Sequence, residues 1–138
     1  MTKAKNNVLK ANLDFVNLTY TPSSNLLEIE YNSEFTIEVE HTKEMVEEIK
    51  RLINNRAALF LVTSTDNFLT ISTDSTNFLA NAQRKFHYSV ATAFVTKILA
   101  NRISANFYIK FARPPQPCKI FKTRKEALVW LSEFSSGE

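Results

Sequence analysis

Hydroxyl and carboxyl side chains cluster between Ser72 and Ser75, at the predicted start of a helix. Thr73 or Asp74 fits the N-cap position, where a side-chain oxygen accepts a hydrogen bond from a free backbone N–H group. A phosphate on Ser75 would be stabilised at the same place, because the helix dipole and the free N–H groups attract a charge of about −1.5 to −2. Asp74 and Ser75 therefore form a candidate phospho-switch, and the alternative is that this cluster only caps the helix.

Other residue types that carry out catalysis or bind metals are scarce and isolated. The chain has two histidines, His41 and His87, on separate predicted elements, and one cysteine, Cys118. A catalytic or metal centre needs several such side chains at one place. Phosphate-binding loops and nucleophile elbows need glycine, and the only glycine is Gly137. We therefore predict a protein that is not an enzyme and that uses no metal or other cofactor.

Charge is distributed unevenly along the 138 residues, although the formal net charge is only +3. Residues 28–48 contain eight glutamates, whereas residues 75–125 contain no acidic residue. Lys97 and Arg102 lie in the basic half, on a helix predicted to begin at Thr96, and form a candidate docking surface for an acidic protein partner. The alternative is that the acidic and basic segments contact each other within the fold.

The spacing of apolar residues predicts alternating strands and helices. Residues 57–62 form a continuous apolar run, which is typical of a central strand covered on both faces. The other expected elements are a hairpin at 12–20 and 27–31, helices at 42–53, 73–86, 96–111 and after Thr123, and strands at 87–95 and 119–122. This order predicts an α/β fold with a mostly parallel sheet, an antiparallel edge hairpin and about four helices.

The last third of the chain carries the most specific local signals. Pro114, Pro115 and Pro117 fix φ and remove backbone donors, so the aromatic helix before them ends there. Thr123 and Glu126 have the spacing of a capping box. The apolar residues that follow at helical spacing are Ala127, Trp130, Leu131 and Phe134. We therefore expect a C-terminal helix that packs on the core.

This order of elements resembles the STAS-like family, the domains related to anti-sigma factor antagonists and to the cytosolic domain of sulfate transporters. The segments that carry the resemblance are residues 106–111, 114–117, 119–121 and 126–131. The chain is most similar to the small stand-alone bacterial branch of that family. In anti-sigma factor antagonists, a partner kinase phosphorylates a serine at the start of the helix after the central strand, which switches binding off. The positional match here is Ser75, after Asp74.

The resemblance implies a STAS-like sandwich and a non-catalytic regulatory or scaffolding module that binds a protein partner, with signalling and a homodimer left open. We expect one domain at residues 8–134, a flexible N-terminal arm at 1–7 and a frayed tail at 135–138. A cytoplasmic location is expected, because no apolar run approaches the roughly 20 residues of a membrane span.

The alternative function is that of a carrier of a small apolar ligand or lipid. Aromatic side chains such as Phe60, Phe94 and Tyr108 could line a cavity of several hundred Å³ instead of filling a core. Basic and aromatic residues alternate in residues 107–113, which is also a feature of single-stranded nucleic-acid binding. Helical spacing, however, is expected to turn the apolar residues of this helix inward, namely Leu99, Ala100, Ile103, Phe107 and Phe111. No nucleic-acid partner is therefore expected.

Overall fold

The computed structural model describes residues 7–64 and 68–135. The strands of this part are β1 (Leu9–Asn12), β2 (Val16–Thr21), β3 (Leu26–Tyr31), β4 (Ala58–Ser64), β5 (Ser89–Val95) and β6 (Cys118–Phe121). The helices are α2 (Val39–Ile53), α3 (Thr73–Phe86), α4 (Leu99–Phe107), which continues as the π-helical turn η1 (Tyr108–Ala112), and α5 (Arg124–Ser132). The predicted arm at 1–7 and tail at 135–138 lie outside the described residues, apart from Asn7 and Ser135.

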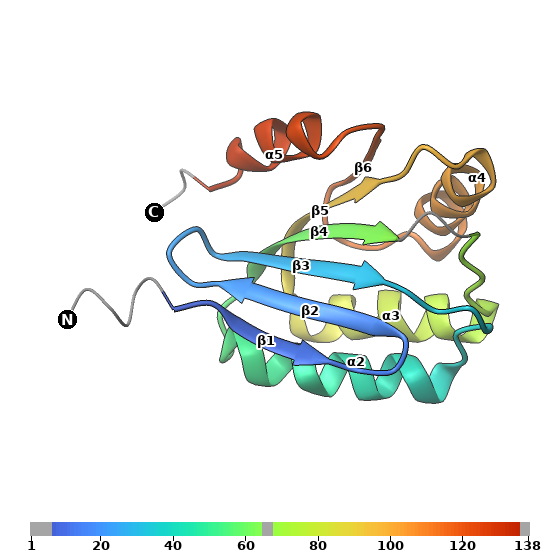
Figure 1. The fold of residues 1–138 in the computed structure, drawn as a ribbon, viewed down its shortest axis with the longest axis horizontal. Helices are drawn as coiled ribbons and strands as arrows, with labels where there is room; N and C mark the ends of the chain where they lie inside the picture. The colour runs from blue at the N-terminus through green and yellow to red at the C-terminus, as the bar shows by residue number, and fades with distance from the viewer. Residues whose placement is uncertain (1–6, 65–67, 136–138) are drawn as a thin grey trace.

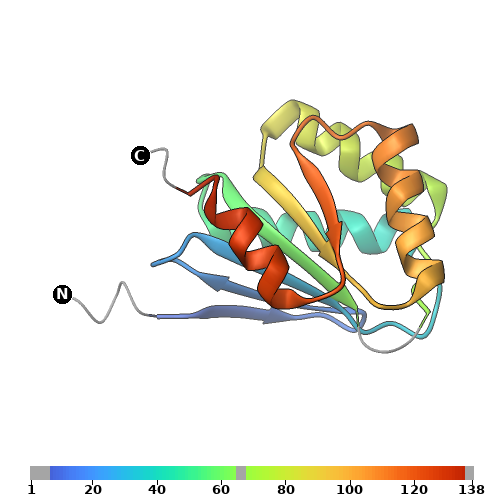
Figure 2. The same cartoon turned by 90° about the horizontal axis from the view of Figure 1, so that it is seen from above.

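The strands form one mixed sheet in the order β1-β2-β3-β4-β5-β6. β1, β2 and β3 pair antiparallel, and β3 to β6 pair parallel. Helices α2 and α3 lie on one face of the sheet and α5 lies on the other, while α4 stands beside the carboxyl ends of β4 and β5 (Figures 1 and 2). This arrangement confirms the predicted α/β fold with an antiparallel edge hairpin. No described helix has the length and apolar character needed to span a bilayer.

The central strand β4 has the environment that its apolar sequence predicts. It pairs with β3 on one side and β5 on the other, and its first four residues are buried. Because side chains alternate along a strand, Phe60 belongs to the core beneath α2, whereas Leu59 and Leu61 pack with Ala127 and Leu131 of α5. The two faces of the sheet therefore have separate hydrophobic cores.

The N-terminal part of the sheet has one more strand than the sequence pattern predicts. Residues 12–20 are not one strand, because the chain turns between β1 and β2, where the Leu13 N–H donates to the Val16 carbonyl (2.8 Å). The change of apolar phase at Phe15 and Val16 marks this turn, and both residues are buried. A phase shift in a short apolar run fits a turn as well as a bulge, which is why the pattern alone did not reveal β1.

Helix boundaries differ from the predicted ones where side chains make unexpected caps. α2 has Glu38 rather than Thr42 at its N-cap, and the Glu38 N–H donates to His41 Nδ1 (2.8 Å). Strand β5 begins after His87, because His87 ends α3 in the left-handed conformation (φ 53°). The two histidines therefore have roles at helix ends, and His87 does not lie on a strand as predicted.

The C-terminal helix confirms its predicted cap and packing. Thr123 is the N-cap of α5, and its hydroxyl oxygen accepts a hydrogen bond from the Glu126 N–H (3.2 Å). The Glu126 carboxylate accepts from the Thr123 hydroxyl (3.1 Å), where a full capping box would use the backbone N–H. Arg124 forms an ion pair with Glu28 (2.8 Å). The acidic and basic parts of the sequence thus meet at this point in the fold.

Candidate functional site

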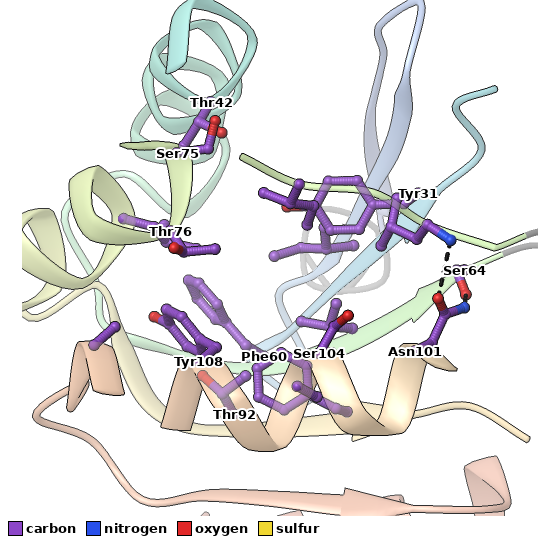
Figure 3. Close-up of a pocket in the computed structure, with 18 of the residues that line it drawn as sticks. Tyr31, Thr42, Phe60, Ser64, Ser75, Thr76, Thr92, Asn101, Ser104 and Tyr108 are labelled. Atoms are coloured by element: carbon purple, nitrogen blue, oxygen red, sulfur yellow. Dashed lines mark hydrogen bonds between the residues drawn. The ribbon is translucent and has the colours of Figure 1, made fainter. Parts of the chain in front are cut away.

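A cavity of about 340 Å³ lies between the sheet and helices α2, α3 and α4 with η1 (Figure 3). Its floor consists of alternate side chains from the carboxyl halves of β3, β4 and β5, namely Ile29, Tyr31, Phe60, Val62, Thr92 and Phe94. The carboxyl ends of parallel strands are where open α/β sheets usually bind ligands. The cavity therefore occupies the position in the fold that is most suited to a binding site.

The walls come from three helices and combine apolar side chains with a few hydroxyl and amide groups. α2 contributes Met45 and Ile49, α3 contributes Leu79, and α4 with η1 contributes Ala105 and Tyr108. The Phe94 and Tyr108 rings meet edge to face, with centroids 6.0 Å apart. None of the described lining residues carries a charged side chain. The cavity can therefore surround an apolar molecule and offer it neutral hydrogen-bonding groups.

Burial keeps the two phenols of the cavity protonated. Loss of hydration raises the pKa of Tyr31 and of Tyr108, for which burial is the largest cause. The Tyr31 hydroxyl donates to the Met45 sulfur (3.5 Å). The cavity therefore presents neutral phenol groups to a ligand.

Some of the remaining polar side chains of the cavity are paired with protein groups. The Gln116 side-chain amide donates to Thr92 Oγ1 (3.0 Å), which is also 2.8 Å from the Ser89 hydroxyl oxygen, whereas the buried Gln116 Oε1 has no hydrogen-bond partner in the described part of the chain. The Ser75 hydroxyl donates to the Ile37 carbonyl (3.2 Å). Such paired hydroxyl and amide groups are compatible with an apolar cavity, because buried polar groups cost little once they are hydrogen-bonded.

Asn101 holds α4 against the open end of the sheet. Its Oδ1 accepts a hydrogen bond from the Leu69 N–H (2.9 Å), and its Nδ2 donates to the Ser64 hydroxyl oxygen (3.3 Å), as the dashed lines in Figure 3 show. Asn101 is the buried residue of α4, with 7% of its surface exposed. A polar side chain thus attaches this helix to the sheet. The spacing of apolar residues in the sequence did not predict this contact.

The predicted phospho-switch residue is part of the cavity wall. Ser75 is 1% exposed, and Ser72 is the N-cap of α3, with its hydroxyl oxygen accepting from the Ser75 N–H (3.1 Å). The cap is therefore neither Thr73 nor Asp74, although Asp74 lies in the first turn and is exposed. A kinase would reach Ser75 only after the start of α3 opened, and the switch itself stays a prediction.

Lys97 and Arg102 are not on one helix as predicted. Lys97 is exposed in the loop before α4, because the Thr96 N–H still donates to the Phe121 carbonyl at the edge of the sheet (3.1 Å). The helix begins only at Leu99, and Arg102 lies on it half-buried. The two cations therefore flank the first turn of α4, and their docking role stays a prediction.

The apolar residues of α4 face solvent, contrary to the inward packing predicted for them. Their exposed fractions are 65%, 56%, 61% and 61% for Leu99, Ile103, Phe107 and Phe111, respectively. Because these four residues are spaced four positions apart, their side chains lie along one side of the helix. We call this set of four residues the α4 ridge. The Phe107 and Phe111 rings lie 4.3 Å apart and also border the cavity. Ala100 is exposed as well.

Cys118 lacks the features of a reactive thiol. Burial raises its pKa to about 12, so the thiol is protonated at neutral pH. Its sulfur donates to the Gln116 carbonyl (3.5 Å). Within residues 7–64 and 68–135, no group of three or more His, Cys, Asp or Glu side chains could hold a metal ion. The cavity is therefore the strongest candidate site in the described part of the chain.

Comparison with known proteins shows the fold of this chain and the family to which it belongs. A solved structure from Shewanella loihica PV-4, an uncharacterized protein of the DUF3478 family with a SpoIIAA-like fold, matches with a TM-score of 0.58 and 14% identity over 89% of this chain and 98% of that chain. The chain thus has the STAS-like fold that its sequence predicted. Residues 20–135 match the family described as domain of unknown function DUF7793, and the chain belongs to this family. Among curated proteins, no match is found.

Proposed function

We propose that the protein is a non-catalytic carrier or sensor that binds a small apolar ligand in the cavity between the sheet and α4. The observation that supports this proposal is the cavity itself, whose 340 Å³ fall within the range of about 300–1,000 Å³ that ligand pockets occupy. Most of the surface of its lining is apolar, and the hydroxyl and amide groups among the described lining residues are neutral, which is also typical of such pockets.

The apolar character and partial opening of the cavity support the same proposal. The cavity is partly open to solvent, so water can fill it when no ligand is present. Water in an apolar pocket finds few hydrogen-bonding partners, and an apolar ligand that displaces it gains free energy. Because apolar walls hold water poorly, we expect an apolar occupant.

A pair of tryptophan variants on α4 tests the proposal. Ala105→Trp places an indole in the cavity wall, whereas Ala100→Trp places the same ring at an exposed position that does not line the cavity. Native mass spectrometry of the purified chain and thermal shifts with a library of apolar compounds give the readout. We expect a bound compound in the parent chain and in the Ala100→Trp variant, and its loss in the Ala105→Trp variant. Equal binding by both variants, or no bound compound in any chain, would contradict the proposal.

The α4 ridge favours a second candidate function, the docking of an acidic protein partner. Four apolar side chains exposed in a row form a surface that soluble proteins usually cover. Cations accompany the ridge, at Lys97, Arg102, Lys110 and Arg113, and none of these four forms an ion pair with another described residue. Charge complementarity therefore points to an apolar groove with carboxylates at its rim. The protein would then act as a regulatory module, which we expect in the cytoplasm. Its partner would bind beside the cavity mouth.

Photo-cross-linking tests this second candidate. A photoreactive phenylalanine at Ile103 samples the ridge, and one at Val129, which is 60% exposed on α5, serves as the control. We expect cells that natively contain the protein to yield one acidic cross-linked protein from position 103 only. A cross-linked product of twice the 15.8 kDa chain would instead assign the ridge to a homodimer. The same products from both positions would contradict a specific docking role.

A further inference from the structure

We infer that the cavity selects an uncharged ligand of about a dozen non-hydrogen atoms, such as an aromatic alcohol or ketone, over its carboxylate and ammonium analogues. This inference rests on the proposed ligand-binding function and narrows it to one chemical class. Three features of the cavity support it, namely the charge of its walls, the helix terminus that borders it and its volume.

No described lining residue carries a charge that could pair with an ion inside the cavity. All described lining residues are apolar or neutral polar, and the two phenols stay protonated because burial raises their pKa. The guanidinium of Arg84, whose charge acts on Tyr108, is engaged in hydrogen bonds to the carbonyls of Ala112 and Arg113. An unpaired ion loses its hydration on entering such a site and gains no partner. A neutral ligand avoids this loss.

The α3 N-terminus, which borders the cavity, is also poorly suited to an anion. Its Ser75 N–H donates to the Ser72 hydroxyl oxygen (3.1 Å), and its Thr76 N–H donates to the Ser72 carbonyl (3.1 Å). Asp74 adds a negative charge in the same turn. The Ser75 and Thr76 N–H groups are therefore used within the helix, and the Asp74 carboxylate disfavours an anion in the same turn.

The volume sets the size of the ligand. A protein cavity of about 150 Å³ accommodates benzene with its six carbons, so 340 Å³ correspond to roughly 14 non-hydrogen atoms by the same ratio. Six aromatic rings border this space, those of Tyr31, Phe60, Phe94, Phe107, Tyr108 and Phe111. Aromatic rings pack well edge to face against another ring. A bicyclic aromatic compound matches this shape, whereas a long-chain lipid exceeds the volume.

Three matched probes test the selection by charge. These are 2-naphthol, 2-naphthoate and 2-naphthylmethylammonium, titrated at neutral pH and followed by amide chemical shifts and calorimetry. We expect 2-naphthol to bind at least about 100-fold more tightly than either ion, because burying an unpaired charge is costly. We also expect the affinity for 2-naphthoate to rise as the pH falls toward the pKa of its own carboxyl group.

Two lysine variants on α4 provide a charge control. Ser104→Lys adds a cation to the lining, at a residue whose exposure leaves room for it, whereas Asn106→Lys adds one at an exposed position outside the lining. We expect Ser104→Lys to raise the affinity for 2-naphthoate at least 10-fold and Asn106→Lys to leave it unchanged. Tight binding of either ion by the parent chain, or a charged compound inside the cavity of the purified protein, would overturn the inference while the ligand-binding function stood. If no probe binds and no compound co-purifies, the proposed function itself fails.

Discussion

Replacing Asn101 by alanine is expected to destabilise the protein and loosen α4 from the sheet. The substitution removes the acceptor of the Leu69 N–H (2.9 Å) and the donor to the Ser64 hydroxyl (3.3 Å). The Leu69 N–H is partly buried. Leaving a buried backbone N–H unsatisfied costs about 1–3 kcal/mol, and losing a neutral hydrogen bond costs about 1 kcal/mol. We therefore expect the free energy of unfolding to fall by about 2–3 kcal/mol.

Urea denaturation and a thermal melt measure this loss. For a chain of 138 residues, a destabilisation of 2–3 kcal/mol corresponds to a Tm decrease of roughly 6–12 °C. Asn106→Ala on the exposed side of the same helix is the matched control, and it is expected to change the free energy of unfolding by less than about 0.5 kcal/mol. Amide hydrogen exchange should accelerate in α4 in the Asn101 variant, because the helix has lost its polar attachment.

Similar stabilities for the Asn101→Ala and Asn106→Ala variants would refute this reasoning. That result would mean that α4 is held by its other contacts, among which packing against β6 is the main one with a strand. A large loss of stability without faster exchange in α4 would place the effect in the core rather than at the cavity mouth.

Three further predictions concern the ridge, the thiol and the candidate switch. Ile103→Glu should change the free energy of unfolding by less than about 0.5 kcal/mol because Ile103 is exposed. Leu61→Ala, at a fully buried residue, should lower it by about 2–5 kcal/mol. Equal losses of stability in urea denaturation would contradict an α4 ridge that faces solvent. Burial raises the pKa of Cys118 from 9.0 to about 12, so the contribution of the buried thiol to stability is complete below pH 9 and declines as the pH rises toward 12. Cys118→Ala should therefore remove part of the loss of stability at alkaline pH. An unchanged profile of stability against pH would be inconsistent with a buried thiol. Ser75→Asp should destabilise by about 2 kcal/mol or more, because an unpaired carboxylate would enter a site that is 1% exposed, and full stability in a thermal melt would show that a phosphate could be accommodated there.

Local signals predicted much of the fold because they depend on residues close together in sequence. The apolar run at 57–62 predicted a buried central strand, and β4 is such a strand. Thr123 and Glu126 predicted the start of α5, and three prolines predicted the end of the aromatic helix before it. Such signals act within a few residues, through fixed φ angles, missing donors and side-chain caps.

The candidate site was less predictable, because it depends on the distances and orientations of whole elements. The sequence showed that Leu99, Ile103, Phe107 and Phe111 share one side of a helix, but not that this side faces solvent. Periodicity defines a stripe relative to the helix axis and says nothing about which neighbour covers it. Only the tertiary structure revealed that Asn101 turns the opposite side of α4 toward the sheet.

The sequence by itself determined the α/β class, the buried strand β4, the proline stop and the capped C-terminal helix. The tertiary structure decided that α4 stands away from the floor of β3 to β5 and leaves a cavity of 340 Å³. It also decided that Ser75 forms part of a wall instead of an accessible site. The physical reason is that a cavity is a gap between packed elements, and its existence depends on contacts between residues far apart in the chain.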